Sequence, residues 1–244
     1  MSALMLRLIA CVTMLIDHIG YQYNIHLFRC IGRIAFPVFV FLIVNGYRHT
    51  SGKARYALRL GIFALVSQVP FSLFCYNSFW HSNGNVFVTL FLSLVCIWTV
   101  DRLLHSRNLR LLAFLPTLAI CGLYYFGVLD SDYGIRGILF ALTFYFFARE
   151  GNKNAGFMTI GMLLSIYYPF LLQCVRWVLG GAAPVLSSWE LTQIYSLLAI
   201  GLILLYNGKK GSTPGSPVLA KLTQLSFYIF YPAHMLILWL IRVF

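Results

Sequence analysis

The stretch MLIDHIG, residues 14–20, places an acid and a histidine inside an apolar segment that runs from residue 4 to residue 23. That segment has the length that a bilayer requires of a transmembrane helix. Ionisable side chains are costly at membrane depth, so they usually mark chemistry or transport. Consecutive positions of a helix point about 100° apart, so Asp17 and His18 face different neighbours. In the alternative interpretation, neighbouring helices satisfy the two side chains separately and neither has a chemical role.

The composition of the 244-residue chain excludes an ordinary soluble domain. Hydrophobic residues make up 60% and charged residues 10%, with a mean hydropathy of +0.82. A soluble domain carries about 25% charged residues. We therefore predict one integral-membrane domain over residues 1–244. The net charge of +12 does not indicate nucleic-acid binding, because the basic residues lie in short loops and not on one face.

Hydropathy predicts the fold class: an all-α, polytopic transmembrane bundle of about nine spans, within a range of eight to ten. The fourth and sixth segments are short for a full crossing. The expected spans lie near residues 3–23, 30–47, 56–76, 85–100, 111–128, 135–148, 155–179, 190–206 and 222–243.

Basic residues concentrate in alternate loops of this arrangement. The loops after the second, fourth, sixth and eighth spans carry Arg48, Lys53, Arg55, Arg102, Arg107, Arg110, Arg149, Lys153, Lys209, Lys210 and Lys221. The other loops carry Asp130, Asp132 and Glu190. Because Lys and Arg are retained on the cytoplasmic side, we predict a cytoplasmic N-terminus and an external C-terminus.

This topology places Asp17 and His18 in the outer half of the first span. Other polar residues fall on the same side and are expected to converge with them: Arg29, Arg33, Asn85, Asp130, Asp132, Tyr133 and Arg136. Arg7 and Arg59 lie toward the cytoplasmic side, and His234 lies near mid-depth. The sequence thus predicts an externally biased polar cluster.

His18 is the candidate general base, because an imidazole titrates near neutrality. Helix geometry makes Asp17 better placed to hold a basic residue from another span, such as Arg33, than to orient His18. A purely structural hydrogen-bonding role for His18 is the alternative.

The remaining candidates each have two interpretations. Pro37 can kink the second span and open space beside Arg33, whose guanidinium would then hold donor phosphates or balance a carboxylate. Snorkelling to the interface is the alternative for Arg33, and interfacial anchoring is the alternative for Arg59. The Asp132-Tyr133 turn also fits helix capping, and His234 also fits a satisfied core residue.

No metal site is expected, since none of the six cysteines forms a Cys-x-x-Cys pair or has histidines at ligand spacing. The chain also lacks a glycine-rich phosphate loop and a nucleophile elbow. From the residues alone, an enzyme and a proton-coupled carrier remain open.

Six stretches resemble the TraX family of membrane proteins. They are MLIDHI (14–19), GRIAFPVF (32–39), GYRH (46–49), NVFVTL (85–90), DYGIRG (132–137) and FYIFYPAH (227–234). Each is weak alone, but together they occur in order over nearly the whole chain.

The resemblance implies an acyl-CoA-dependent acyltransferase in the bacterial cytoplasmic (inner) membrane, related to proteins associated with pilin acetylation. It implies that His18 is the essential base and that Arg33 and Arg59 bind the donor or stabilise charge. The donor, acetyl-CoA or another acyl-CoA, is expected to place its phosphates near Arg48, Arg55 and Arg59. The substrate is expected to contact Asn85, Asp132, Tyr133, Arg136 and His234. Unlike the pilin-modifying member, this chain has no long polar extension before its first span, and nothing in it identifies pilin as acceptor.

The expected reaction moves an acetyl or other short acyl group to an amine or hydroxyl at the external face. The acceptor is an unidentified peptide, glycan, lipid or small molecule, and membrane lipids surround the protein. The leading alternative is a proton-coupled secondary transporter using Asp17 and His18, which predicts inverted repeats that the sequence lacks. A structural or assembly role is a third alternative.

Overall fold

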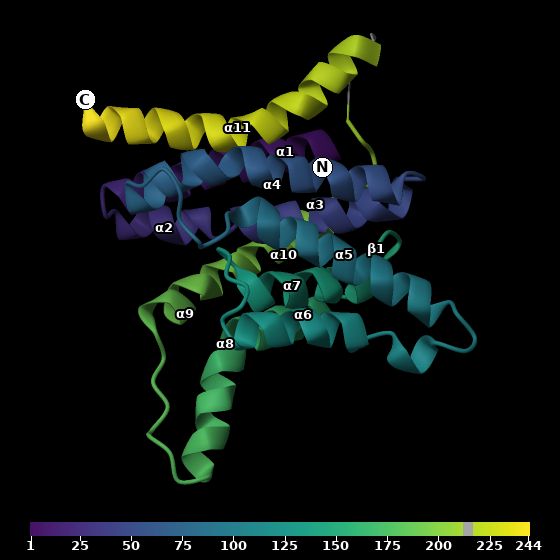
Figure 1. Ribbon diagram of the computed structural model, residues 1–244. Helices are drawn as coiled ribbons and strands as arrows, with labels where there is room; N and C mark the ends of the chain where they lie inside the picture. Colours follow the sequence, from purple (N-terminus) through teal and green to yellow (C-terminus); the bar gives the residue numbers. More distant parts are fainter. Residues whose placement is uncertain (212–216) are drawn as a thin grey trace.

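The computed structural model describes residues 1–211 and 217–244 as a bundle of helices packed side by side (Figure 1). Within α11, it describes the side chains of residues 223 and 225–244. The elements are α1 (Ala3–Gln22), α2 (His26–Gly32), α3 (Ala35–His49), α4 (Lys53–Tyr76), α5 (Val86–Leu104), η1 (Arg110–Leu112), α6 (Leu115–Tyr125), α7 (Gly134–Phe147), β1 (Ala148–Arg149), β2 (Asn152–Lys153), α8 (Ala155–Val178), α9 (Ser188–Gln193), η2 (Ile194–Leu197), α10 (Leu198–Leu204) and α11 (Pro217–Val243).

The all-α membrane architecture is confirmed at the level of helices. Among the described residues, six helical segments are long and apolar enough to cross a bilayer: Ala3–Gln22, His26–His49, Lys53–Tyr76, Val86–Leu104, Ala155–Val178 and Leu225–Val243. Three shorter apolar segments, Arg110–Tyr125, Gly134–Phe147 and Ser188–Leu204, match the other expected spans in position but have at most 17 residues. The count of nine spans therefore stays a prediction.

Several helices begin where a polar side chain caps their first turn. The Ser2 hydroxyl accepts a hydrogen bond from the Met5 amide, and Asn85 accepts one from Phe87. The α9 helix begins with a capping box, in which Ser187 and Glu190 satisfy each other's backbone amides. These caps pair amides that have no partner within the helix, which sets where each helix starts.

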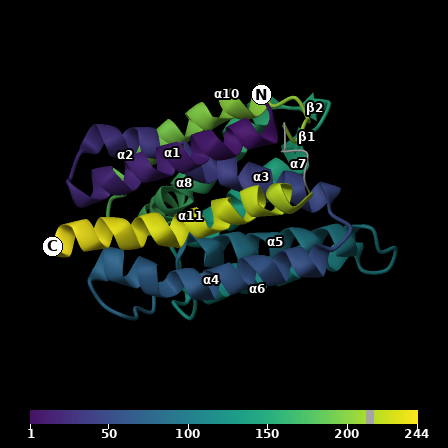
Figure 2. The ribbon, with the colours of Figure 1, turned by 90° about the horizontal axis from the view of Figure 1, so that it is seen from above.

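The α3 helix lies at the centre of the bundle, in contact with α1, α5, α7 and α10. Its side chains Val38, Phe41, Val44 and Tyr47 are buried almost completely. Seen from above, α11 runs between α1 and α4 (Figure 2), and it contacts both. This placement brings the last helix of the chain against the first.

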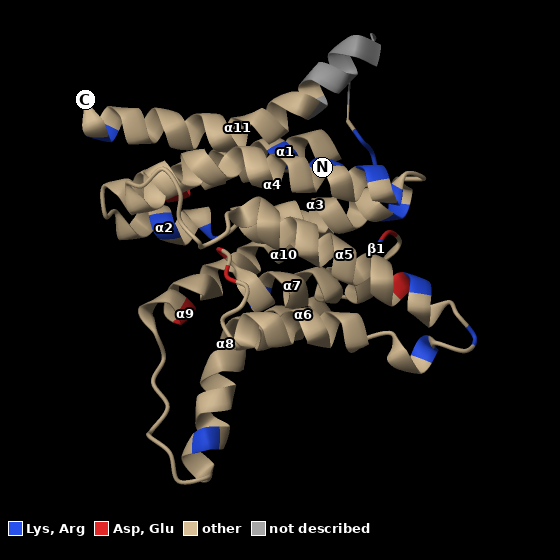
Figure 3. Ribbon diagram, in the orientation of Figure 1, with Lys and Arg blue, Asp and Glu red and all other residues tan. Residues whose placement is uncertain are grey.

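The basic loops gather at the end of the bundle where α1 begins (Figure 3). The turn after α3, the loop after α5 and the segment after α10 all lie at that end. This common location agrees with the alternation in loop charge. The side of the membrane on which this end lies stays a prediction.

Gly32 allows α1 and α2 to approach closely. A Cβ atom at this position would lie 2.2 Å from the Asp17 Cβ, a distance that no packed structure tolerates. The glycine therefore allows Asp17 to lie directly against α2.

We expect Gly32→Ala to lower the free energy of unfolding by about 1–3 kcal/mol, because the added methyl group must push the two helices apart. Gly201→Ala in α10 is the matched control, since a Cβ there meets nothing within 4 Å. Denaturant or thermal unfolding of the two purified variants measures the effect. Equal stability of the two variants would contradict the close packing of α1 on α2.

Candidate functional site

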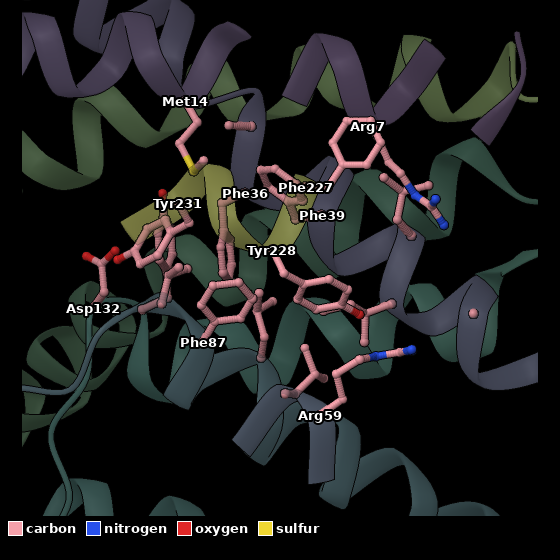
Figure 4. A pocket seen from close by; sticks show the side chains of 18 of the residues that line it. Arg7, Met14, Phe36, Phe39, Arg59, Phe87, Asp132, Phe227, Tyr228 and Tyr231 are labelled. Carbon is pink, nitrogen blue, oxygen red and sulfur yellow. The ribbon is translucent and has the colours of Figure 1, made fainter. Parts of the chain in front are cut away.

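A cavity of about 320 Å³ lies between α1, α3, α4, α5 and α11. Asp132 and Tyr231 lie at one end and Arg7 and Arg59 at the other (Figure 4). The polar residues in its lining are Arg7, Asp17, His18, His49, Thr50, Tyr56, Arg59, Asp132, Tyr133, Lys210, Tyr228 and Tyr231. The cavity therefore has a basic end near the start of α1 and an Asp/His/Tyr end near the finish of α1.

His18 and His234 form a direct hydrogen bond across the α1–α11 contact. The His18 Nδ1 and His234 Nε2 atoms are 2.7 Å apart. The ring centroids are separated by 4.9 Å with only 23° between the ring planes, which fits an in-plane N–H···N bond. In the sequence each histidine is isolated, and the fold brings the two together as a pair.

The hydrogen bonds assign the tautomers of this pair in its neutral form. The Nδ1 atom of His234 lies 2.6 Å from the Phe230 carbonyl oxygen, which can only accept. His234 therefore carries its proton on Nδ1, and its Nε2 accepts from the Nδ1–H of His18. This leaves the Nε2 of His18 with a free lone pair, and no hydrogen bond from the described residues reaches that atom. An imidazole held in this way is oriented to take a proton.

Asp17 forms ion pairs with two arginines, Arg29 within α2 and Arg33 at the C-terminal end of α2. Its Oδ2 lies 2.6 Å from Nη1 of Arg29, and its Oδ1 lies 3.3 Å from Nη2 of Arg33. The predicted pairing of Asp17 with Arg33 is confirmed, and His18 forms its hydrogen bond elsewhere. The arginine of the shorter contact, Arg29, was expected only in the general cluster.

The turn before α7 carries Asp132 and Tyr133 into the cavity wall. The Ser131 hydroxyl is hydrogen-bonded to Thr89 at 2.8 Å and to Tyr124 at 2.7 Å, which anchors the turn. The Tyr133 ring stacks on Phe36 with 3.5 Å between centroids. Asp132 is exposed at the cavity surface, yet the surrounding protein displaces enough solvent to raise the pKa of its carboxyl to about 6, against the opposing effect of Arg33.

The basic end contains two arginines that lie against aromatic rings. The Arg59 guanidinium lies 5.2 Å from the Tyr56 ring centroid and 5.3 Å from that of Tyr228. Arg7 lies 5.9 Å from the centroid of Phe227. Neither arginine has a carboxylate within 4 Å among the described residues, so both charges are available to an anionic ligand.

Two residues that were expected near the donor phosphates, Arg48 and Arg55, lie outside the lining of this cavity. Arg48 donates to the carbonyls of Phe144, Tyr145 and Ala148 and so caps the end of α7. Arg55 is exposed to solvent.

Asn85 and Arg136 also have structural partners. The Asn85 amide donates to Ala64 and Gln68 while it caps α5. Arg136 lies 3.8 Å from Glu190 and 4.1 Å from the ring centroid of Trp189.

Sequence reasoning missed Tyr231 as part of the site. Its side chain lines the cavity beside Asp132, and its buried hydroxyl donates to no acceptor in the described part of the chain. The available signal was its spacing, because Tyr231 lies three residues before His234 and therefore on the same helical face.

Comparison with known proteins places this arrangement in a family. The model of the family described as TraX protein matches residues 2–242. The chain belongs to the TraX family. This membership confirms the resemblance carried by the six sequence stretches. A curated relative of this TraX chain is a probable fimbrial assembly protein, FimC of serogroup H1, from Dichelobacter nodosus. It is 27% identical over 97% of this chain and 94% of its own length. No solved structure matches the chain.

Proposed function

We propose that this TraX protein is a membrane-embedded acyltransferase that moves an acetyl or other short acyl group from acyl-CoA to an amine or hydroxyl. The observation that carries the proposal is the His18–His234 pair, which leaves an unprotonated His18 nitrogen in a cavity whose far end is basic. A base and an anion-binding end joined by one cavity suit a donor with phosphates at one end and a reactive carbonyl at the other.

The dimensions of the cavity support this donor. Arg7 and His18 are eleven residues apart on α1, which corresponds to about 16 Å along the helix axis. The extended pantetheine arm of CoA spans a comparable length between its phosphates and its sulfur. The phosphates would lie among Arg7, Arg59 and Lys210, and the thioester would reach His18.

In the proposed reaction, the acceptor nitrogen or oxygen attacks the thioester carbonyl while the His18 Nε2 takes its proton. The C–S bond then breaks, and the leaving thiolate recovers the proton as the free thiol of CoA. The hydrogen bond from His18 to His234 holds the imidazole in the tautomer that this step requires.

Two hydroxyl groups are placed to stabilise the developing oxyanion. Tyr231 and Tyr133 both line the cavity at the His18 end, and the Tyr231 hydroxyl has no competing acceptor among the described residues. A preorganised donor of this kind favours the transition state over the substrate. Asn85 is less suitable for this role, because its side-chain amide already donates hydrogen bonds to Ala64 and Gln68.

An external acceptor is consistent with the predicted topology, which puts the His18 end of the cavity in the outer half of the membrane. The relative from Dichelobacter nodosus is named a probable fimbrial assembly protein. A surface-directed acceptor for the present chain agrees with that name and with the predicted topology.

The direct test is the release of free thiol from acetyl-CoA by purified protein supplied with an extract of candidate acceptors. We expect release to depend on the acceptor, and Arg59→Gln to raise the KM for acetyl-CoA about tenfold by removing one phosphate contact. Arg55→Gln is the matched control, because Arg55 is exposed and outside the cavity lining. Absence of both acetyl-CoA binding and thiol release would refute the proposal.

A proton-coupled carrier is the second candidate, because the linked histidines beside Asp17 also form a possible proton path within the membrane. This candidate predicts solute uptake by proteoliposomes under a pH gradient, without any thiol release from acyl-CoA.

Two substitutions of His234 separate the effect of its side-chain shape from the effect of its hydrogen bond to His18. We expect His234→Gln to retain a large part of the activity, because its side-chain oxygen can accept from the Nδ1–H of His18. His234→Leu should lower kcat about 10²-fold, since it leaves His18 without an orienting partner. Equal losses in both variants would contradict the orienting role.

Asp132 predicts a specific pH dependence of stability. Its folded-state pKa of about 6 lies above the ordinary value of 3.8, so the folded protein binds the proton more tightly than the unfolded chain. Relative to Asp132→Asn, the wild type should lose stability as the pH rises from about 4 to about 6 and then level off. Melting temperatures of both proteins between pH 4 and 7.5 measure this, and parallel curves would contradict it.

A further inference from the structure

A second cavity, of about 500 Å³, lies between α2 and the α9–η2 segment. Its polar lining includes His26, Arg29, Arg33, Ser188, Trp189 and Thr192. Every formally charged residue in this lining is an arginine, and no described carboxylate contributes to it. The predicted topology places this cavity on the external side.

The two arginines separate this second cavity from the first. Asp17 lines the first cavity, Arg29 and Arg33 line the second, and ion pairs join them. Arg33 is only 5% exposed, and its Nε atom is buried without a hydrogen-bond partner among the described residues.

In the wall between the two cavities, the single carboxylate of Asp17 is paired with the guanidinium groups of both Arg29 and Arg33. Asp132 lies close enough to influence both arginines electrostatically, but it forms no ion pair within 4 Å with either. The Glu190 carboxylate already accepts hydrogen bonds from Ser187 and lies 3.8 Å from the Arg136 guanidinium. The Nε and Nη2 atoms of Arg29, whose side chain is 26% exposed, therefore keep N–H donors that no described residue accepts, and these donors attract an oxyanion to the second cavity.

We propose that the second cavity binds a carboxylate or phosphate group of the acceptor. The role as acceptor site rests on the proposed acyl transfer, whereas the anion site itself does not. Arginine presents several N–H donors in a plane that matches both oxyanions. The Ser188 hydroxyl adds a donor on the opposite wall, whereas the Thr192 hydroxyl already donates to the Ser188 carbonyl. The acceptor class is thus an amine or hydroxyl compound that also carries an anionic group.

The position of the cavity explains how such an acceptor would reach the base. An anion held by Arg29 and Arg33 lies across the ion pairs from Asp17, which is adjacent to His18 in α1. Acyl transfer then requires the neighbouring amine or hydroxyl of the same molecule to pass the outer end of this wall into the first cavity. The donor enters from the opposite, basic end, so the two substrates do not compete for space.

The test uses isothermal titration of the purified full-length protein with inorganic phosphate and, separately, with succinate. Thr192→Asp introduces a carboxylate into the second cavity, and Thr192→Asn is its uncharged control of the same shape. We expect Thr192→Asp to weaken binding of the anion at least tenfold and Thr192→Asn to change it less than threefold. Ser188→Asp and Ser188→Asn form a second pair if the first aspartate variant does not fold.

Titration in the presence of saturating CoA identifies the cavity. Binding to the second cavity should persist, whereas an anion held by Arg7 and Arg59 should be displaced. Phosphate binding alone assigns a phosphate-bearing acceptor, and succinate binding alone assigns a carboxylate-bearing one. Lack of binding of both anions by the wild type, displacement by CoA, or equal weakening by the Asp and Asn variants would overturn the proposal. Because no acyl donor is needed, a failure of acyl transfer and a failure of anion binding are separate results.

Discussion

His18→Ala should reduce acyl transfer from acetyl-CoA by about 10²–10⁴-fold, the range expected when a general base is removed. The variant keeps the basic end of the cavity intact, so its affinity for acetyl-CoA should stay within about twofold of the wild type. The His18 nitrogen that would take the proton in the proposed reaction is the one left free by the hydrogen bonds through His234 and Phe230. Thiol release and donor binding, measured on the same preparation, separate the two effects.

The matched control is His105→Ala. His105 lies at the end of α5 with a side chain that is 79% exposed, and it is not part of the cavity lining. The His105→Ala variant should transfer acyl groups at the wild-type rate. If His18→Ala retained full activity, His18 would be a structural residue and the proposed base would be wrong.

Asp17→Ala should lower the free energy of unfolding by about 3–5 kcal/mol, because it leaves Arg29 and Arg33 without their shared carboxylate. Arg33 is buried at this site, so water cannot readily replace the lost partner. Unfolding of the purified protein, followed by helical circular dichroism, measures the change.

Asp130→Ala is the control for Asp17→Ala, since Asp130 is an exposed loop acid without an ion pair among the described residues. Replacing Arg29 by Met in the Asp17→Ala background should restore part of the lost stability by removing one unpaired charge. A neutral effect of Asp17→Ala alone would show that the ion pairs contribute nothing to the α1–α2 contact.

The sequence predicts the general features that depend on local patterning. Apolar segments of bilayer length identify the helices, and the spacing within α1 separates the directions of Asp17 and His18. The pairing of Asp17 with Arg33 followed from that separation and is confirmed. The number of complete crossings is not determined in the same way, because α7 and the α9–α10 segment are apolar yet short.

The sequence cannot predict contacts that depend on how distant helices pack. His18 and His234 are 216 residues apart, and only the position of α11 along α1 makes them partners. The same holds for Arg48, whose basic side chain suggested a phosphate contact but which caps α7. Polar residues near a site therefore divide into those facing the cavity and those completing the backbone, and only the fold separates them.

The central claim is that one cavity carries an acyl group from a donor at the basic end to an acceptor at the opposite end. Proteoliposomes of uniform orientation, loaded with radiolabelled acetyl-CoA on the side of the basic loops and supplied with acceptor extract on the other, test it directly. The account predicts covalent label on the external acceptor and an equal amount of free CoA thiol inside, with both absent for His18→Ala. Label that crosses without covalent attachment, or no transfer by the wild type with its active acceptor extract, would contradict it.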